Sequence, residues 1–331
     1  MTSMDKKTAP APPEGGVLEA PRRTLFQENW NLFRKNRLAM AGLVIFVAFF
    51  IIALTGLFLT YGRNPYFNPA LVRLQEKLRP PLSKPNLETL KPEEVPRLGI
   101  YLFGTDDLGR DVFSRMLQGS WVSLTVGFVA VSIAVVIGIF LGGIAGYYGH
   151  WRVLGLFSVD VLITGLIDIM LCFPSFFLIL TVVALLPASI YNIMIVIGLT
   201  SWMGAARFVR AEFLSLRELD FVTAAKALGV SDWRIIFRHM VPNAMAPVLV
   251  SATIGIATAI LTEAGLSFLG FGVPPPDATW GNILSNGKNF LFDAPWLTFI
   301  PGFAVLIVVL AFNLFGEGLR DVLNPKLKER H

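Results

Sequence analysis

Residues 217–242 read R-E-L-D-F-V-T-A-A-K-A-L-G-V-S-D-W-R-I-I-F-R-H-M-V-P and form a polar interruption between two hydrophobic blocks. In the first half, apolar side chains recur at i, i+3, i+4 and i+7, namely at Phe221, Ala224, Ala225 and Leu228. That spacing places them on one face and predicts a short amphipathic helix. Gly229 follows directly. Because glycine accepts the left-handed conformation that ends many helices, we expect a sharp turn there.

A second short helix is predicted after this glycine. Ser231 suits its N-cap, and Asp232 would place a carboxylate at the positive end of the helix dipole. The apolar spacing recurs at Trp233, Ile236, Phe237 and Met240. Pro242 is expected to close the unit, because proline lacks the N–H that a helix interior needs. The segment therefore predicts two angled amphipathic helices, which would either dock on a partner protein or lie on lipid headgroups.

The composition identifies the chain as a membrane protein. Of its 331 residues, 54% are hydrophobic and 15% are charged, and the mean hydropathy is +0.62. Soluble domains have about a quarter of their residues charged, so this chain is too apolar to be one. The net charge of +5 lies in short basic segments beside hydrophobic blocks, which is typical of topology control, and no nucleic-acid partner is expected. A single cysteine, Cys172, and three scattered histidines predict neither a disulfide nor a metal site, and no cofactor is expected.

Hydrophobic blocks divide the chain into six expected membrane spans in an all-α protein. A span needs about 20 apolar residues, and the first block, 38–60, contains no charge. The spans are expected at 38–60, 119–148, from 159 to a turn near 187, 193–206, 241–263 and 296–315. In the second span, Gly138, Gly142 and Gly146 recur every four residues. Such a stripe lets another helix approach closely in lipid.

The polar segments between the spans give the domain organisation. Residues 1–23 are expected to form a disordered cytoplasmic tail. An interfacial helix and the first span cover 24–60, with Thr24 and Gln27 as a capping box. Residues 61–118 form a proline-rich extracytoplasmic loop, 119–320 a five-helix transport core that includes a loop at 212–242, and 321–331 a cytoplasmic tail.

The distribution of Lys and Arg predicts the orientation of the chain. Basic residues concentrate before the first span, in 207–242 and after Phe315, whereas the turn near Pro187 has none and the 267–295 loop has only Lys288. The positive-inside rule then places both termini and the 212–242 loop in the cytoplasm.

Two segments resemble a known family. The Thr223-Ala224-Ala225 triplet, with Gly229 and Pro242 at the same spacing, resembles the E-A-A-x-x-x-G-x(9)-I-x-L-P signature of ABC-importer permease subunits. Thr223 stands where the signature has Glu, and His239 where it has Ile. The surrounding run from Arg210 to Gly229, with R-H-M-V-P-N after it at 238–243, is similar to the dipeptide, oligopeptide and nickel importer branch, second permease of the pair. The run from Phe103 to Arg115, F-G-T-D-D-L-G-R-D-V-F-S-R, is similar to the segment that precedes the transport core in the same family.

The resemblance implies a type I importer permease fold and a set of partners. It implies a heterodimer with a homologous permease, two ABC ATPase subunits and an extracytoplasmic substrate-binding protein, in the inner membrane of a bacterium or archaeon. It also implies that the 212–242 loop is the coupling element that docks on an ATPase. The docking residues would be Phe221, Thr223, Ala224, Ala225, Leu228, Gly229, Trp233 and Pro242.

Polar residues within the spans are candidates for the translocation path. A charge in a span costs at least about 2.5 kcal/mol on insertion scales, so Asp168 and Glu263 require an explanation. They would line the path or hold its gate together with Asn313, or else lie near span ends or pair within the bundle. The segment before Asp168 departs from the family pattern, since Gly165 stands where an Arg is often found.

No catalytic function is expected of this chain. Its nearest approach to a phosphate-binding loop, Gly281 to Lys288, is one residue too long and is followed by Asn289 where Ser or Thr is required. ATP hydrolysis would therefore occur in partner subunits. The expected function is the import of di- or oligopeptides by alternating access, with nickel or glutathione as alternative cargo of the same family. An ATPase-independent secondary carrier and a membrane anchor without a transport role are the rival classes.

Overall fold

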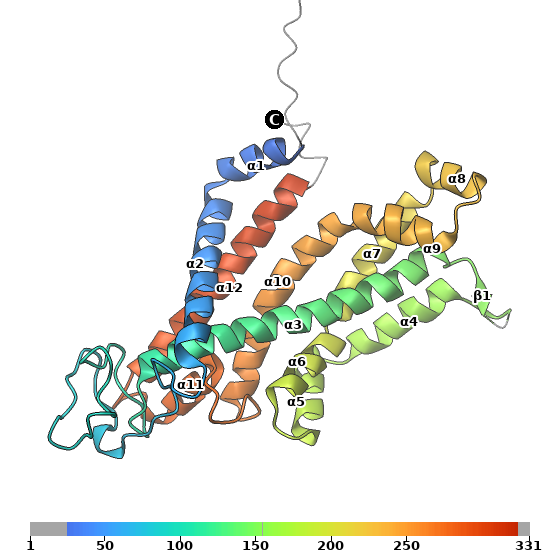
Figure 1. Ribbon diagram of the computed structural model, residues 1–331. Coiled ribbons are helices and arrows are strands. Elements are labelled where there is room, and N and C mark those ends of the chain that lie inside the picture. Colours follow the sequence, from blue (N-terminus) through green and yellow to red (C-terminus); the bar gives the residue numbers. More distant parts are fainter. Residues whose placement is uncertain (1–24, 154, 324–331) are drawn as a thin grey trace, which may run out of the picture.

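The computed structural model describes residues 25–153 and 155–323, and the side chains of 25, 26 and 28 are excluded from that description. The expected tail at 1–23, the capping residue Thr24 and the segment after 323 lie outside the described residues. The described chain is mainly helical, apart from a long loop at 61–111, shorter connecting loops and a small β-hairpin (Figure 1).

Long helices run between the two ends of the molecule. Five of these helical segments are long and apolar enough to cross a membrane, and a sixth arises if the bent pair α4–α5 counts as one span. In chain order the elements are α1 (Leu25–Lys35), α2 (Arg37–Thr60), the 3-10 turn η1 (Leu74–Glu76), α3 (Val112–Tyr147), β1 (Arg152–Val153), β2 (Phe157–Ser158), α4 (Val159–Cys172), α5 (Ser175–Leu185), α6 (Ile190–Leu199), α7 (Trp202–Leu216), α8 (Asp220–Ala227), α9 (Asp232–Ile235), a π-helical turn (Ile236–Met240), α10 (Val241–Phe268), α11 (Trp280–Gly287), η3 (Lys288–Phe290) and α12 (Trp296–Leu323).

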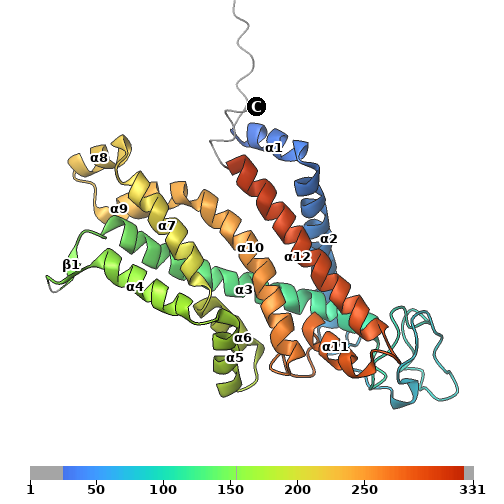
Figure 2. The ribbon, with the colours of Figure 1, turned by 180° about the vertical axis from the view of Figure 1, so that it is seen from behind.

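The two ends of the molecule carry different elements. The α8 end holds α1, the end of α12, the β1–β2 hairpin and the pair α8–α9. The α11 end holds the 61–111 loop, α5 and α11 (Figure 2). Helix α1 and the C-terminal residues of α12 lie at the same end of the molecule. This is the arrangement that an even number of membrane spans, such as six, requires.

The helices differ from the expected spans in three places. The second span starts at Val112 instead of Gly119, because Asp111 caps the helix by accepting hydrogen bonds from the N–H groups of Phe113 and Ser114. The predicted loop at 61–118 therefore includes the first two turns of α3. The third span bends by 83° between α4 and α5, at Pro174, and the fourth comprises two helices, α6 and α7.

The sequence predicts that Pro242 closes the second amphipathic helix, but the structure does not show this. It lies in the first turn of α10, and the helical path continues from Asp232 to Phe268. The π-helical turn directly before the proline changes the backbone hydrogen-bond pattern, with the N–H of Val241 donating to Ile236 O. The π-helical turn at 236–240 joins α9 to α10 without a break.

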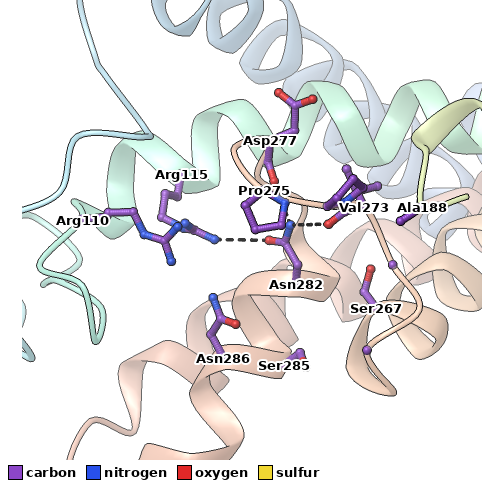
Figure 3. Close-up of a pocket in the computed structure, with 13 residues that line it drawn as sticks. Arg110, Arg115, Ala188, Ser267, Val273, Pro275, Asp277, Asn282, Ser285 and Asn286 are labelled. Atoms are coloured by element: carbon purple, nitrogen blue, oxygen red, sulfur yellow. Dashed lines mark hydrogen bonds between the residues drawn. The ribbon is translucent and has the colours of Figure 1, made fainter.

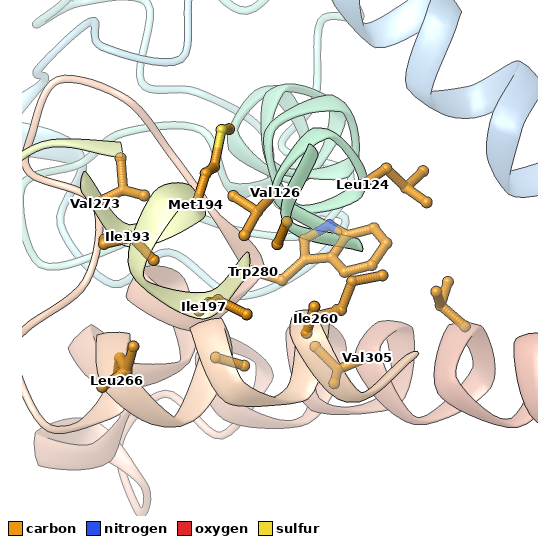
Figure 4. Close-up of a cluster of buried hydrophobic side chains, with 14 of the residues drawn as sticks. Leu124, Val126, Ile193, Met194, Ile197, Ile260, Leu266, Val273, Trp280 and Val305 are labelled. Atoms are coloured by element: carbon orange, nitrogen blue, oxygen red, sulfur yellow. The ribbon is translucent and has the colours of Figure 1, made fainter. Parts of the chain in front are cut away.

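The main core lies toward the α11 end and is centred on Trp280 (Figure 4). Its indole is 1% exposed, packs edge-on against Phe49 and donates from Nε1 to the carbonyl of Met116 at 3.2 Å. The capping box of Thr279 and Asn282 starts α11 at this residue. The sequence predicts only a loop at 267–295, so the helix that carries this buried residue is a finding of the structure.

The glycine stripe of α3 packs against α7, which confirms the predicted close approach. A Cβ atom added at Gly142 would lie 2.4 Å from the carbonyl oxygen of Ala206, and one added at Gly146 would lie 2.4 Å from the Cβ of Phe213. Gly138 is equally close to Ala205. Larger residues would separate α3 from α7.

We expect Gly142→Ala to destabilise the protein, because the new methyl group has no space against Ala206. Overpacking of this kind costs about 1–3 kcal/mol. Gly165→Ala is the matched control, since nothing lies within 4 Å of its added Cβ and alanine favours a helix. Thermal unfolding of the detergent-purified protein compares the two variants, and equal midpoints would refute the packing role of the stripe.

Candidate docking hairpin and translocation groove

The helices α8 and α9 form a hairpin whose turn depends on Gly229. Its φ of +73° lies in the left-handed region, as the sequence predicts. The N–H of Gly229 donates to Lys226 O at 3.0 Å, and that of Val230 donates to Ala225 O at 3.1 Å. These two bonds satisfy carbonyl groups at the end of α8 and fix the direction of the chain into α9.

The inner face of this hairpin is packed against the transport helices. Val222, Ile235 and Met240 are completely buried, in a cluster with Phe213 of α7 and Tyr147 of α3. Such close packing makes the hairpin and the ends of α3 and α7 one mechanical unit.

The outer face of the hairpin exposes large apolar side chains. Phe221 is 41%, Leu228 83%, Trp233 67% and Phe237 43% exposed, and the rings of Trp233 and Phe237 lie 4.1 Å apart. Thr223, Ala224, Gly229 and Pro242 are also exposed, and Ala225 is half-buried.

The predicted single stripe of Trp233, Ile236, Phe237 and Met240 is wrong in one respect. Trp233 and Phe237 face outward, whereas Ile236 and Met240 face the protein core. The residues diverge because the helix widens into the π-helical turn from Ile236 onward, which changes the angular step between them.

A polar contact locks α9 to the end of α3. The hydroxyl of Tyr147 donates to Asp232 Oδ1 at 2.6 Å, and that of Tyr148 donates to Oδ2 at 3.3 Å. The Lys226 ammonium lies 4.8 Å above the Tyr147 ring. Burial, followed by the adjacent Asp232 carboxylate, raises the pKa of Tyr148, so this phenol stays a donor. The sequence predicts Asp232 only as a first-turn residue, and no motif marks the two tyrosines as its partners.

Asp168 forms an ion pair on the face of the bundle. Its Oδ1 lies 2.6 Å from Arg207 Nη2, with the side chains 66% and 54% exposed. Asp160 and Arg210 form a second, more buried pair between the same helices, α4 and α7. The sequence treats Asp168 as a single acid, because its partner is 39 residues away.

Glu263 and Asn313 are not brought together. Glu263 is completely buried and accepts a hydrogen bond from Ser267 at 2.7 Å, while its Oε2 has no hydrogen-bond partner among the described residues. Asn313 is exposed and donates to the carbonyl of Val309 in its own helix at 2.8 Å. Glu263 thus contributes no surface to a path in this conformation.

A groove of about 230 Å³ lies between α3, the α6–α7 junction and α10. Small and hydroxylated residues line it, including Ser201, Gly204, Ser251, Gly255, Thr258 and Thr262. The groove is not lined by Asp168, Glu263 or Asn313. The sequence pattern does not reveal it, because these residues come from three separate blocks.

The geometry defines a helical membrane protein with five or six candidate spans, an exposed apolar hairpin at one end and a groove between its helices. Within residues 25–153 and 155–323, no cluster of three His, Cys, Asp or Glu residues could hold a metal ion. The chain belongs to the family of binding-protein-dependent transport system inner membrane components, whose model matches residues 134–329. A model for the N-terminal transmembrane domain of oligopeptide transport permease C matches residues 24–81.

Named relatives match along most of the chain. The dipeptide transport system permease protein DppC of Alkalihalophilus pseudofirmus is 41% identical over 97% of this chain and 95% of its own length. The oligopeptide permease OppC of Bacillus subtilis is 36% identical, covering 92% of this chain and 91% of its own. The glutathione permease GsiD of Pectobacterium atrosepticum is 34% identical over 92% and 93%.

Solved structures also match part of the chain. An inward-facing form of the MetNI methionine ABC transporter is 17% identical and covers 64% of this chain and 98% of its own, with a TM-score of 0.48.

We expect Tyr147→Phe to loosen the docking hairpin, because Asp232 loses its shortest hydrogen bond. Loss of a hydrogen bond to a charged group costs about 1.5–3 kcal/mol. Amide hydrogen exchange in residues 220–235 reports this loss as faster exchange. Tyr191→Phe is the control, since Tyr191 is 71% exposed. Unchanged exchange in the Tyr147 variant would show that the contact does not brace the hairpin.

Proposed function

We propose that this chain is one of two homologous permease chains in an ATP-driven importer of di- or oligopeptides. The outer face of the α8–α9 hairpin carries this proposal, because it presents four large apolar side chains from a segment that is braced on its inner face. Both termini and the hairpin would lie in the cytoplasm, and the α11 end would face the extracytoplasmic binding protein. The domain boundaries expected from the sequence then apply, with the loop shortened to 61–111.

The hairpin would dock on an ATPase subunit through its exposed face. Phe221, Leu228 and Trp233 would supply the apolar contacts, and Thr223, Ala224, Ala225, Gly229 and Pro242 would shape the surface around them. Large apolar and aromatic side chains that fill pockets dominate the binding energy of most interfaces. A helix lying on lipid needs no rigid support, whereas this hairpin is held by the buried cluster and by Asp232.

ATP-driven movement of the ATPases would reach the path through α3. The contact of Tyr147 with Asp232 joins the hairpin to α3, and the glycine stripe joins α3 to α7. The groove lies between these helices and α10, so a rigid displacement of the hairpin changes its walls. Two ATPase subunits, moving one hairpin on each permease chain, would produce alternating access.

The groove supports a path for peptides. Small side chains leave room for a main chain, and the hydroxyl groups of Ser201, Ser251, Thr258 and Thr262 suit its carbonyl and amide groups. The exposed pair of Asp168 with Arg207 would lie beside this path, and Glu263 would lie behind it. The relatives named for dipeptide and oligopeptide transport favour peptides as cargo, and the relative named for glutathione makes a modified tripeptide the alternative.

We expect Trp233→Glu to abolish co-purification of an ATPase subunit, because a buried, unpaired carboxylate would replace an apolar contact. Gly229→Val should have the same effect, since valine is strained at a φ of +73° and would reorient the hairpin. Leu156→Glu is the control, because Leu156 is 76% exposed at the same end but lies in the β1–β2 turn, outside the α8–α9 hairpin. Intact assembly and transport by both hairpin variants would favour the carrier function instead.

We expect Thr258→Trp to block peptide uptake without loss of the ATPase, because the indole would fill the groove. Uptake of a radiolabelled peptide into proteoliposomes should fall at least about tenfold, and ATPase co-purification should stay unchanged. Leu261→Trp is the matched control on the same helix, where Leu261 is 55% exposed and does not line the groove. Full uptake by the Thr258 variant would place the path elsewhere.

A further inference from the structure

A second cavity, of about 290 Å³, lies at the α11 end of the molecule (Figure 3). Its walls come from the residues just before and within α3, the end of α10, the 270–277 loop and α11. Its polar side chains include Arg110, Arg115, Asn282, Ser285 and Asn286. None of the functions described above uses this cavity.

Two guanidinium groups in its wall have fewer acceptors than donors. Arg110 Nε donates to Asp106 Oδ2 at 2.7 Å, and the side chain is 9% exposed at the cavity wall. Arg115 is 3% exposed and donates to Asn282 Oδ1 at 3.3 Å, while its Nε and Nη1 have no hydrogen-bond partner in the described chain. Arg115 Nη1 is 3.6 Å from the same Asp106 oxygen. Both arginines therefore share one carboxylate.

The other carboxylates near the cavity do not act as hydrogen-bond acceptors for the two arginines. Asp277 accepts from Gln118 at 3.3 Å and points away from Asn286 in Figure 3. Asp107 lies close enough to Arg115 to interact electrostatically but makes no hydrogen bond through its buried Oδ1. Asn286 makes no hydrogen bond in the described chain and projects toward the two arginines. Buried donors without acceptors are costly, so the cavity favours an incoming acceptor.

We propose that this cavity binds the C-terminal carboxylate of a peptide before it enters the groove. The inference rests on the proposed function, because it requires peptide cargo arriving at the α11 end. Arginine binds carboxylates through paired N–H donors, and Asn286 supplies a further N–H group. The volume is close to the lower limit of small-ligand pockets, about 300 Å³, and has room for the C-terminal end of a peptide. Ser267 in its wall follows Thr262 of the groove by five residues, about 7.5 Å along α10.

The test uses the complete importer in proteoliposomes with its own binding protein. Uptake of tetra-alanine is compared with uptake of tetra-alanine amide, which lacks the terminal charge. Asn286→Asp places a carboxylate against the incoming one without removing the Arg110–Asp106 pair, and Arg110→Lys is a second variant that keeps the positive charge. Lys288→Gln is the control, because Lys288 is exposed, is two residues away and does not line the cavity.

We expect Asn286→Asp to lower the acid-to-amide ratio of kcat/KM roughly tenfold, as for loss of a charge-assisted hydrogen bond. The preference of the binding protein is the same in every variant and cancels in this comparison. Arg110→Lys should lower the ratio less, and Lys288→Gln should leave it unchanged.

Two results would overturn the inference. An unchanged ratio in both cavity variants would show that the terminal carboxylate does not bind there. An equal loss for acid and amide, with a higher KM for the binding protein, would assign the site to an acidic side chain of that protein. Either result leaves uptake by the unmodified importer intact, whereas absence of uptake of both peptides by that unmodified importer would refute the proposed function itself.

Discussion

The close approach of α3 to α7 is the constraint on which the rest of the structure depends. Gly138, Gly142 and Gly146 leave no space for a Cβ atom against α7, so the two backbones are in direct contact. In lipid, packing of this kind takes the place of the hydrophobic effect as the force between helices. At 36 residues, α3 is about 54 Å long, well beyond a hydrocarbon core of about 30 Å. A single helix thereby touches the docking hairpin at one end and the Trp280 core at the other.

The two faces of the α8–α9 hairpin differ in exposure. Its inner face is closed by Val222, Ile235 and Met240, and the Tyr147–Asp232 bond adds a directional contact. Its outer face leaves Leu228 and Trp233 largely uncovered. An apolar surface of this kind is costly to leave in water, which favours its burial by a partner protein. A rigid surface binds better than a flexible surface, because it loses little conformational entropy on binding.

Sequence patterns predict the features that depend on local spacing. The membrane class, the glycine stripe and the turn at Gly229 follow from residues that lie within a few positions of one another. The long-range contacts do not follow: Asp168 pairs with Arg207 across 39 residues, and Trp280 of α11 enters a core that also includes residues of α2, α3, α5, α6, α10 and α12. The prediction from apolar spacing assumes 3.6 residues per turn, which does not hold in the π-helical turn at 236–240. For that reason the sequence places Ile236 and Met240 on the wrong face of the helix.

The polar residues of the spans separate into two groups by exposure, and this separation bears on how such a chain could move. Glu263 is completely buried beside Ser267, in the part of α10 that packs around α11, where a buried polar group that keeps its hydrogen bond favours one arrangement of helices. Asp168 and Arg207 are more than half exposed, on helices next to the groove. An exposed ion pair would be costly against lipid, but against water or a second permease chain it can separate and form again at little cost. The buried acid therefore suits a contact that stays fixed, and the exposed pair suits one that can be exchanged when helices move.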